Sequence, residues 1–225
     1  MNKTRSKLFN IYKKLRKHFG FLNWWPGETP FEVMIGAILT QNTSWKNVET
    51  ALNNLKREEL LSFQKLRKIG DESLAELIRP SGYYNQKTKK IKNYLRFMSE
   101  EFGGSIEKMG RVPLDQMRGN LLSVKGIGPE TADSILLYAL GKRIFVVDAY
   151  TRRIFSRIGL VKAGWNYENL QKFFMNNLPD SLKLYNDYHA QVVILGKEIC
   201  RKKPKCPICP LSSLCRYAKN LLLMP

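Results

Sequence analysis

Four cysteines near the end of the chain form its most compact group of residues able to do chemistry. They are Cys200, Cys206, Cys209 and Cys215, separated by gaps of five, two and five residues. Disulfide scaffolds belong mostly to small secreted domains, so in a chain of this size we interpret the four as thiolate metal ligands. Structural zinc more often uses two separated Cys-x2-Cys pairs, whereas one compact four-thiolate loop suits a cubane, so a 4Fe-4S cluster is favoured over zinc.

A turn suited to an anion lies earlier in the chain, at Val124-Lys125-Gly126-Ile127-Gly128. Two glycines around one apolar residue let the backbone turn tightly and leave N–H groups that can hold an anion. Pro129 suits the first position of a helix, apolar residues follow at helical spacing, and Gly141 suits its end. Taken alone, this pentapeptide is more often an ordinary turn between two helices.

Asp148 is the carboxylate best placed for catalysis. It follows the apolar run Ile144 to Val147 and precedes a helical pattern with apolar residues at Ile154 and Ile158. An isolated aspartate in this position is by default a helix N-cap. The spacing by itself therefore leaves two interpretations, a cap and a catalytic group.

The elements that position these residues are all predicted to be helices, since alternating strand patterns of convincing length and internal repeats are absent from the sequence. The run Ile144 to Val147 resembles a strand, but nothing else would pair with it. The predicted helices cover residues 1–23, 30–39, a stretch from about Ser44, two short stretches between Leu61 and Ile78 divided at Gly70-Asp71, the stretch after Lys87, and residues 167–174 and 187–198.

Composition points to a globular protein with a polyanionic partner. Hydrophobic residues make up 44% of the 225 residues, and 38 Lys and Arg against 19 Asp and Glu give a net charge of +19. Nucleic acid is the first candidate partner, although a merely solvated lysine-rich surface gives the same balance. The sequence lacks an apolar run of the roughly 20 residues that a membrane helix needs, and the charged N-terminus does not resemble a signal peptide. We expect a cytoplasmic monomer, nucleoid-associated in a bacterium or archaeon.

Helix, Gly-x-Gly hairpin, helix and the following Ile144–Asp148 segment together resemble the helix-hairpin-helix DNA glycosylases of the endonuclease III superfamily. The resemblance runs from about Pro30 to Cys215, and it reverses the default interpretations of the hairpin and of Asp148. It implies an all-α fold with two helical domains and the active site in the cleft between them. One domain is expected at 28–142 and carries the hairpin; the other combines 1–27 with 143–225 and carries the cluster loop at 200–215.

The resemblance also implies roles for several residues, with double-stranded DNA containing damaged bases as the partner. Asp148 is the catalytic carboxylate, and Lys125, Gly126 and Gly128 contact DNA. Gln41 lies in a segment, 35–43, that resembles the motif whose glutamine fills the space left by an extruded base; the alternative is that it only caps helices. Tyr83 matches the intercalating wedge, with Lys87, Lys89 and Lys90 near phosphates, unless this aromatic turn packs on its own helix.

The cysteine loop resembles that of the endonuclease III and adenine-mismatch glycosylase branches. Those branches usually have six residues in the first gap, where this chain has five, Arg201-Lys202-Lys203-Pro204-Lys205. The shorter gap bears on the identity of the metal and not on the four-thiolate site. A first gap so rich in cations implies that the cluster braces a DNA-facing loop and does no redox chemistry.

One position departs from the bifunctional members of the superfamily. They carry an imine-forming lysine two residues after the second glycine, where this chain has Glu130, so we expect a monofunctional glycosylase. Glu130, the Trp24-Trp25 pair and Trp45 resemble the 3-methyladenine DNA glycosylase branch, which implies a base pocket made by these four residues. On the sequence alone, packing anchors are the commoner role for the Trp24-Trp25 pair.

The expected reaction is hydrolysis of the N-glycosidic bond of an alkylated purine such as 3-methyladenine, flipped out of duplex DNA, leaving an abasic site. Two alternatives stay open. One is an endonuclease III-like glycosylase for oxidised pyrimidines or mismatched thymine or uracil. The other is a non-catalytic module that binds damaged DNA.

Overall fold

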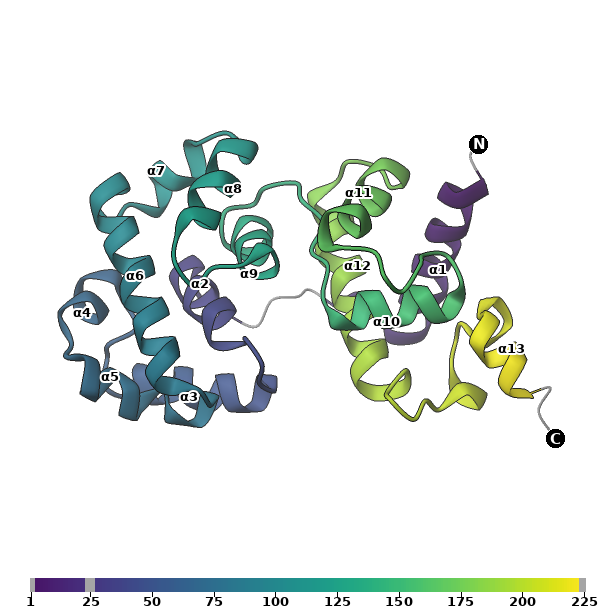
Figure 1. Cartoon of the computed structure of the whole chain (residues 1–225), viewed down its shortest axis with the longest axis horizontal. Coiled ribbons are helices and arrows are strands. Elements are labelled where there is room, and N and C mark those ends of the chain that lie inside the picture. Colours follow the sequence, from purple (N-terminus) through teal and green to yellow (C-terminus); the bar gives the residue numbers. More distant parts are fainter. Residues whose placement is uncertain (1–2, 23–26, 223–225) are drawn as a thin grey trace. The chain divides into compact units, whose positions relative to one another are not determined.

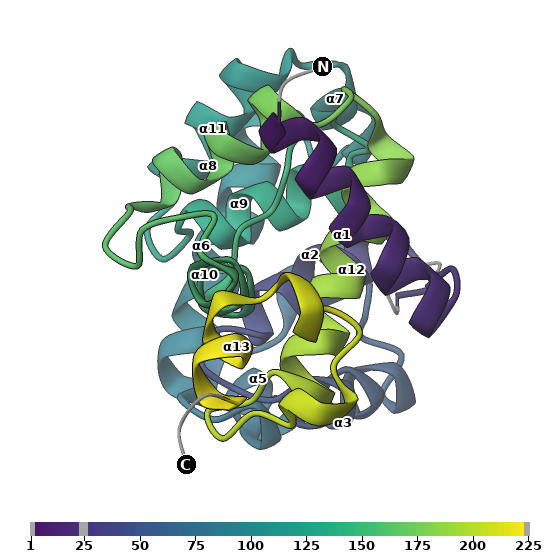
Figure 2. The same cartoon turned by 90° about the vertical axis from the view of Figure 1, so that its right-hand side faces the viewer.

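The computed structural model describes residues 3–22 and 27–222, and it divides the chain into two compact units. One unit spans residues 25–142, and the other combines 1–24 with 143–225. Every regular element in the described ranges is a helix, which confirms the all-α prediction (Figure 1 and Figure 2). Trp24 and Trp25, predicted to belong to the base pocket, lie outside the described residues.

The 25–142 unit is organised around a short, almost wholly buried helix, α2. Thr29 caps it, accepting a hydrogen bond of 3.1 Å from the backbone N–H of Glu32, and Pro30 begins it. Helix α2 packs against α3, α6, α9 and η2. The elements of this unit are α2 (Pro30–Leu39), α3 (Trp45–Arg57), α4 (Phe63–Lys68), α5 (Asp71–Leu77), η1 (Arg79–Ser81), α6 (Tyr84–Phe102), α7 (Ile106–Arg111), α8 (Leu114–Ser123), α9 (Pro129–Ser134) and η2 (Ile135–Ala139).

The other unit has an aromatic core. The rings of Phe145 and Phe174 stack with centroids 4.3 Å apart, and Tyr188 packs edge-on against both. The Tyr188 hydroxyl donates to the Leu8 carbonyl at 2.8 Å, which ties the N-terminal helix to the core. The elements are α1 (Lys3–Phe19), α10 (Ala149–Ile158), α11 (Tyr167–Asn177), α12 (Leu182–Ile194), η3 (Leu195–Ile199), η4 (Cys206–Ile208), η5 (Ser212–Leu214) and α13 (Arg216–Leu222).

Most predicted helices are present, with corrections at their ends. The helix predicted for residues 1–23 stops at Phe19, because Gly20 adopts a φ of 77°. The helix after Pro129 is α-helical only to Ser134 and continues as a π-helical turn, η2. A 3.6-residue apolar pattern does not reveal such a wide turn. The run Ile144–Val147 is buried and has no regular secondary structure, so within the described ranges it forms no strand.

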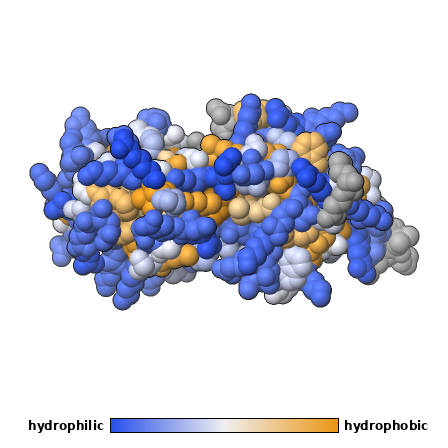
Figure 3. Space-filling view, turned by 90° about the horizontal axis from the view of Figure 1, so that it is seen from above, coloured by the Kyte–Doolittle hydropathy of each residue, from blue (hydrophilic) through white to orange (hydrophobic). Residues whose placement is uncertain are grey.

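Hydrophilic side chains cover much of the surface, although some charged ones, Lys87 among them, are buried. Figure 3 shows hydrophilic side chains over much of the face that it presents. Among the described helices, none combines the length and the apolar character needed to span a membrane.

Candidate functional site

The predicted hairpin joins α8 to α9, and its two glycines have different reasons to be glycine. Gly126 has a φ of 102°, and a Cβ added there would lie 2.4 Å from Cγ of Lys90. Gly128 has an ordinary φ of −96°, caps α9, and would give a Cβ nothing within 4 Å. The first glycine is therefore required by the fold, whereas the second leaves the backbone open to a partner.

Gln41 is held against this hairpin by both ends of its amide. Its Nε2 donates to the Gly126 carbonyl at 3.1 Å and to Thr131 Oγ1 at 3.0 Å. Its Oε1 accepts a hydrogen bond from Nζ of Lys90 on α6. These hydrogen bonds connect Gln41, which follows the end of α2, with the hairpin, with α9 and with α6. None of the three contacts was predicted from the sequence. The role of Gln41 toward an extruded base stays a prediction.

Tyr83, the predicted wedge, is presented by a strained turn. Gly82 and Tyr83 both have positive φ, 67° and 48°, and the Tyr83 side chain is 64% exposed. A bulky residue in the left-handed region costs of order 1–3 kcal/mol and persists only where the surroundings hold it. An exposure of 64% is not that of a ring packed on its own helix, so the packing alternative is wrong for this side chain.

Lys87 is buried, and its amine holds the backbone that leads into this turn. It is 1% exposed, and its Nζ donates to the carbonyls of Leu39 and Ser81, each at 2.7 Å. Burial lowers the pKa of Lys87 to about 8, with a smaller contribution from nearby Lys90. The expectation that Lys87 meets phosphates is therefore wrong, since the amine is enclosed by protein carbonyls. Of the three lysines predicted to do so, Lys89 is the exposed one.

Asp148 caps α10 in the other unit. Its Oδ1 accepts hydrogen bonds from the backbone N–H and from Oγ1 of Thr151, both at 2.7 Å. The structure thus confirms the N-cap interpretation, and the same two donors fix the orientation of the carboxylate. Its second oxygen, Oδ2, lies 3.6 Å from Nε2 of His189 on α12.

The protonation of Asp148 reflects these neighbours. Burial alone raises the pKa of the carboxyl, but His189 and the two Thr151 donors lower it by more, so the net direction is downward. Among the neighbours that lower the pKa, His189 contributes most, and Thr151 follows. The carboxylate is therefore ionised at neutral pH. His189 was not predicted to lie at the site. The sequence did offer a signal for it, because His189 is one of only two histidines and stands in an apolar helix.

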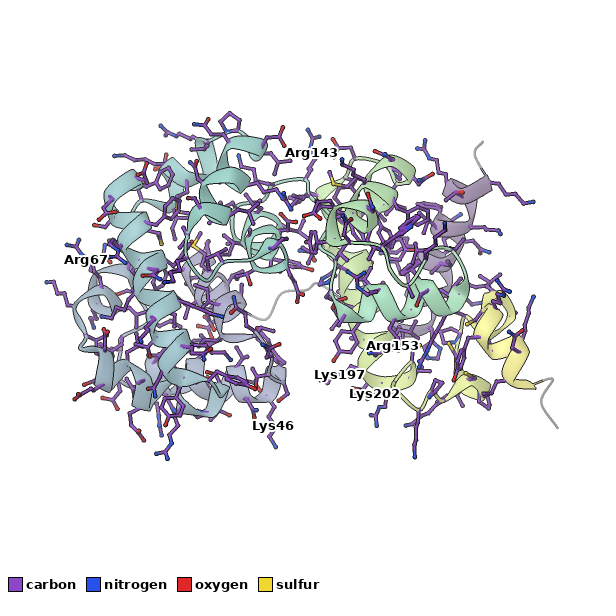
Figure 4. The ribbon with its side chains drawn as sticks, in the orientation of Figure 1. Lys46, Arg67, Arg143, Arg153, Lys197 and Lys202 are labelled. Carbon is purple, nitrogen blue, oxygen red and sulfur yellow. The ribbon has the colours of Figure 1, made fainter. Side chains whose placement is uncertain are left out.

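Two arginines of α10 hold the segment that carries the first cysteine. Arg153 donates to the carbonyls of Gly196 and Cys200, each at 2.9 Å. Arg157 donates to Sγ of Cys200 at 3.3 Å and to the carbonyl of Arg201 at 2.6 Å. Figure 4 shows Arg153 near this segment, together with Lys197 and Lys202. Neither arginine was singled out from the sequence.

The four cysteines are not bridged by disulfides. Burial raises the pKa of Cys206, with smaller contributions from Cys215 and Cys200, and raises that of Cys209 to about 11, with smaller contributions from the other three cysteines. The thiols are thus within electrostatic reach of one another. Within residues 3–22 and 27–222, however, no group of three or more His, Cys, Asp or Glu side chains is arranged to hold a metal ion.

The described residues of the predicted base pocket stand at the beginnings of two helices of the 25–142 unit. Trp45 is the first residue of α3 and is half-buried, and Glu130 is the exposed second residue of α9. Lys125, the predicted phosphate contact, is exposed in the hairpin. The roles assigned to these three residues stay predictions.

We predict that Lys87→Met lowers the free energy of unfolding by about 2 to 4 kcal/mol, because two buried carbonyls lose their donor. In the wild type, the folded pKa of about 8 lies below the unfolded value of about 10.4. The unfolded chain therefore binds more protons between these values, so the free energy of unfolding should rise from pH 8 to 10. This rise should be absent from Lys87→Met in denaturant titrations across that pH range.

The matched control is Lys89→Met, two residues along the same helix but exposed. It should change the free energy of unfolding by no more than about 0.5 kcal/mol and should keep the wild-type pH dependence. Equal effects of the two substitutions would show that the buried amine of Lys87 does not support the fold.

The comparisons with known proteins agree on one family. Residues 35–180 match the HhH-GPD superfamily of base excision DNA repair proteins. A Methanocaldococcus jannaschii protein named for an inferred role as a DNA repair glycosylase is 50% identical over 210 residues, 92% of this chain and 95% of that protein. Endonuclease III of Thermotoga maritima is 33% identical, over 85% of this chain and 84% of its own length.

A solved structure extends this agreement to the fold. The H. pylori 3-methyladenine DNA glycosylase MagIII, bound to 1,N6-ethenoadenine, has a TM-score of 0.75 and 33% identity, and the match covers 85% of this chain and 97% of that one. The hairpin, Gln41 and Asp148 all lie inside the matched residues 35–180. This chain belongs to the HhH-GPD superfamily and is one of its DNA glycosylases.

Proposed function

We propose that this DNA glycosylase is monofunctional and hydrolyses the N-glycosidic bond of a cationic N-alkylated purine, such as 3-methyladenine, flipped out of duplex DNA. The products are the free base and an abasic site, and the strand is left intact. The 33% identity to the H. pylori 3-methyladenine enzyme supports this substrate class. A similar identity to an endonuclease III makes oxidised pyrimidines the main competing substrates.

The observation that carries the monofunctional assignment is Glu130. It stands two residues after Gly128, at the exposed start of α9, where bifunctional members of the superfamily carry a lysine. Strand cleavage by those enzymes begins with an imine between an amine and the opened sugar, and a carboxylate cannot form one. Without an imine at this position, we propose that the base is released by hydrolysis with water alone.

Asp148 supplies the charge that the hydrolysis needs. As the bond to the base breaks, positive charge develops on the deoxyribose, and a fixed carboxylate near C1′ stabilises it and orients the incoming water. The two Thr151 donors hold Asp148 in one orientation, and its lowered pKa keeps it ionised at neutral pH. An intact, oriented carboxylate argues against a module that only binds damage.

The residues of the 25–142 unit serve to hold an unstacked base. Tyr83 enters the stack as an apolar wedge, Gln41 occupies the space left by the base, and Lys125 with the Gly128 backbone contacts phosphate. A cationic base is recognised by stacking on aromatic rings, where cation–π attraction is worth roughly 0.5 to 2 kcal/mol. Trp45 is the described residue that we assign to this stacking, with the exposed Glu130 carboxylate at the pocket edge.

We further propose that Cys200, Cys206, Cys209 and Cys215 hold a 4Fe-4S cluster. Four unbridged thiols on one loop are a donor set that fits this group, and the Arg157 guanidinium directed at Cys200 Sγ suits a thiolate. All four cysteines stand on one compact loop, separated by gaps of five, two and five residues, and such a loop suits a cubane better than a single zinc ion.

The decisive experiment incubates purified protein with duplexes that carry one lesion each and identifies the released base by chromatography. We expect release from 3-methyladenine duplexes under single-turnover conditions, and rates at least 100-fold lower for thymine glycol and uracil. Asp148→Asn should lower release by about 100-fold or more, because it removes charge stabilisation from the transition state. Ready release of thymine glycol with neglect of methylated purines would overturn the substrate and leave the glycosylase assignment standing.

The second test concerns strand cleavage. We expect the wild type to leave the abasic strand intact and to give no covalent adduct with borohydride, whereas Glu130→Lys should gain a trapped adduct because it restores an amine. Glu130→Gln, which changes the charge without adding an amine, is the matched control and should give none. A borohydride-stable adduct with the wild type would show that another amine attacks the sugar.

The third test concerns the cysteines. Anaerobically purified protein should contain about four iron atoms per chain and absorb broadly in the visible range. Cys206→Ser should lose most of this iron, while Ser212→Ala, in the same loop, should keep it. Colourless wild-type protein with stoichiometric zinc would show that the four cysteines hold a zinc ion and not a cluster.

A further inference from the structure

A basic groove lies along α6 in the 25–142 unit, beside the hairpin. Its volume is about 770 Å³, and it is lined by residues of α4, α5, α6 and the hairpin. We name it the α6 groove. Its cations are Arg67, Lys89, Lys92, Arg96 and Lys125.

These cations do not all have the same task. Lys92 donates to backbone carbonyls of residues 67 and 69 and lies 3.7 Å from Asp71, so it serves the fold. Lys89, Arg96 and Lys125 are exposed. The groove therefore presents positive charge to solvent beyond what its own structure uses, which is the charge pattern of a site for phosphates.

The groove is built rigidly at the end nearest the hairpin. Arg96 donates to Asn93 Oδ1 at 2.7 Å, and Asn93 Nδ2 donates to the Lys125 carbonyl at 3.1 Å. This chain of hydrogen bonds fixes the hairpin backbone against α6. At the far end, Arg67 donates to Ser99 Oγ at 3.0 Å, and Figure 4 shows Arg67 beside α6. The carboxylate of Glu100 lines this far end as well, so the hairpin end is the more positive one.

Helix α6 also sets the distance from the groove to the wedge. Tyr83 precedes its first residue, and Arg96 follows Tyr83 by thirteen residues. At 1.5 Å per residue the two are separated by about 20 Å along the helix axis. Along a duplex that runs parallel to α6, with a rise of 3.4 Å per base pair, this length corresponds to about six base pairs.

We propose that the α6 groove holds the phosphate backbone of the duplex that flanks the damaged base, up to about six base pairs from the wedge. The proposal rests on the proposed contacts of Tyr83 and the hairpin with DNA, because Lys125 belongs to both hairpin and groove. Charge complementarity and continuity with the hairpin select DNA as the occupant. The groove adds affinity and register without reading sequence.

The test compares Lys89→Gln/Arg96→Gln with the wild type on duplexes that carry a stable abasic-site analogue, measured by fluorescence anisotropy over a salt series. With flanks of about ten base pairs, the double variant should bind roughly 3- to 30-fold more weakly, and its slope of log K against log salt should be smaller by about 1.8. Flanks of about three base pairs reach past Lys89, which is about 9 Å from the wedge along α6, but do not reach Arg96, so with both flanks cut to this length the difference in slope should fall to about 0.9.

The matched control is Lys108→Gln/Arg111→Gln, which removes the same two charges from exposed positions of α7 outside the groove. It should keep wild-type affinity and slope on both duplexes. Equal weakening by the two double variants, or equal weakening on long and short flanks, would mean that the charges act only through the general field, and would overturn the proposal. Unchanged binding of Lys89→Gln/Arg96→Gln would overturn it too.

Two further measurements keep the result separate from the proposed function. The salt slope on undamaged long duplex needs neither excision nor a wedge, so it tests the groove even if no base is released. If Lys89→Gln/Arg96→Gln fails to fold, Lys89→Gln alone replaces it, with an expected slope change of about 0.9. A slope unchanged in that variant would count against the groove.

Discussion

The buried ammonium of Lys87 is the constraint on which the 25–142 unit depends. A buried cation is tolerated only where hydrogen-bond acceptors replace its water, and here the carbonyls of Leu39 and Ser81 do so. Those carbonyls end α2 and η1, so one amine joins the helix that leads to Gln41 with the turn that presents Tyr83. The strain of a left-handed tyrosine is held by this support. A turn rigid in this way can keep an exposed aromatic ring in a fixed direction.

Other side chains along α6 also hold neighbouring segments by hydrogen bonds. Lys87 holds the turn, Lys90 one turn later holds the Gln41 amide, and Asn93 holds the hairpin backbone. The side chains that we assign to DNA thus stand on one rigid element and its fastened neighbours. A site built this way loses little conformational entropy when it binds a kinked duplex. The α6 groove continues this line beyond the hairpin.

Helix α10 has a comparable role in the other unit, because its side chains also hold a neighbouring segment. Its first turn is capped by Asp148, and its later turns carry Arg153 and Arg157, which hold the segment after η3. The helix is ten residues long, about 15 Å, and it links the Asp148 carboxylate at its start to the cysteine loop that its arginines hold. Loosening the loop removes hydrogen bonds from the helix that Asp148 caps. These hydrogen bonds give the loop a structural role.

The sequence alone determined the all-helical class, the hairpin, the cap at Asp148 and the absence of a lysine at position 130, because each follows from local spacing and residue type. It also supported membership of the superfamily, which the comparisons established. The tertiary structure decided the rest. Lys87, Lys89 and Lys90 read alike in the sequence, yet one is buried, one exposed and one bound to Gln41. His189 meets Asp148 only when α12 packs on α10. Local patterns cannot separate such residues, because burial and long-range partners depend on how distant helices pack.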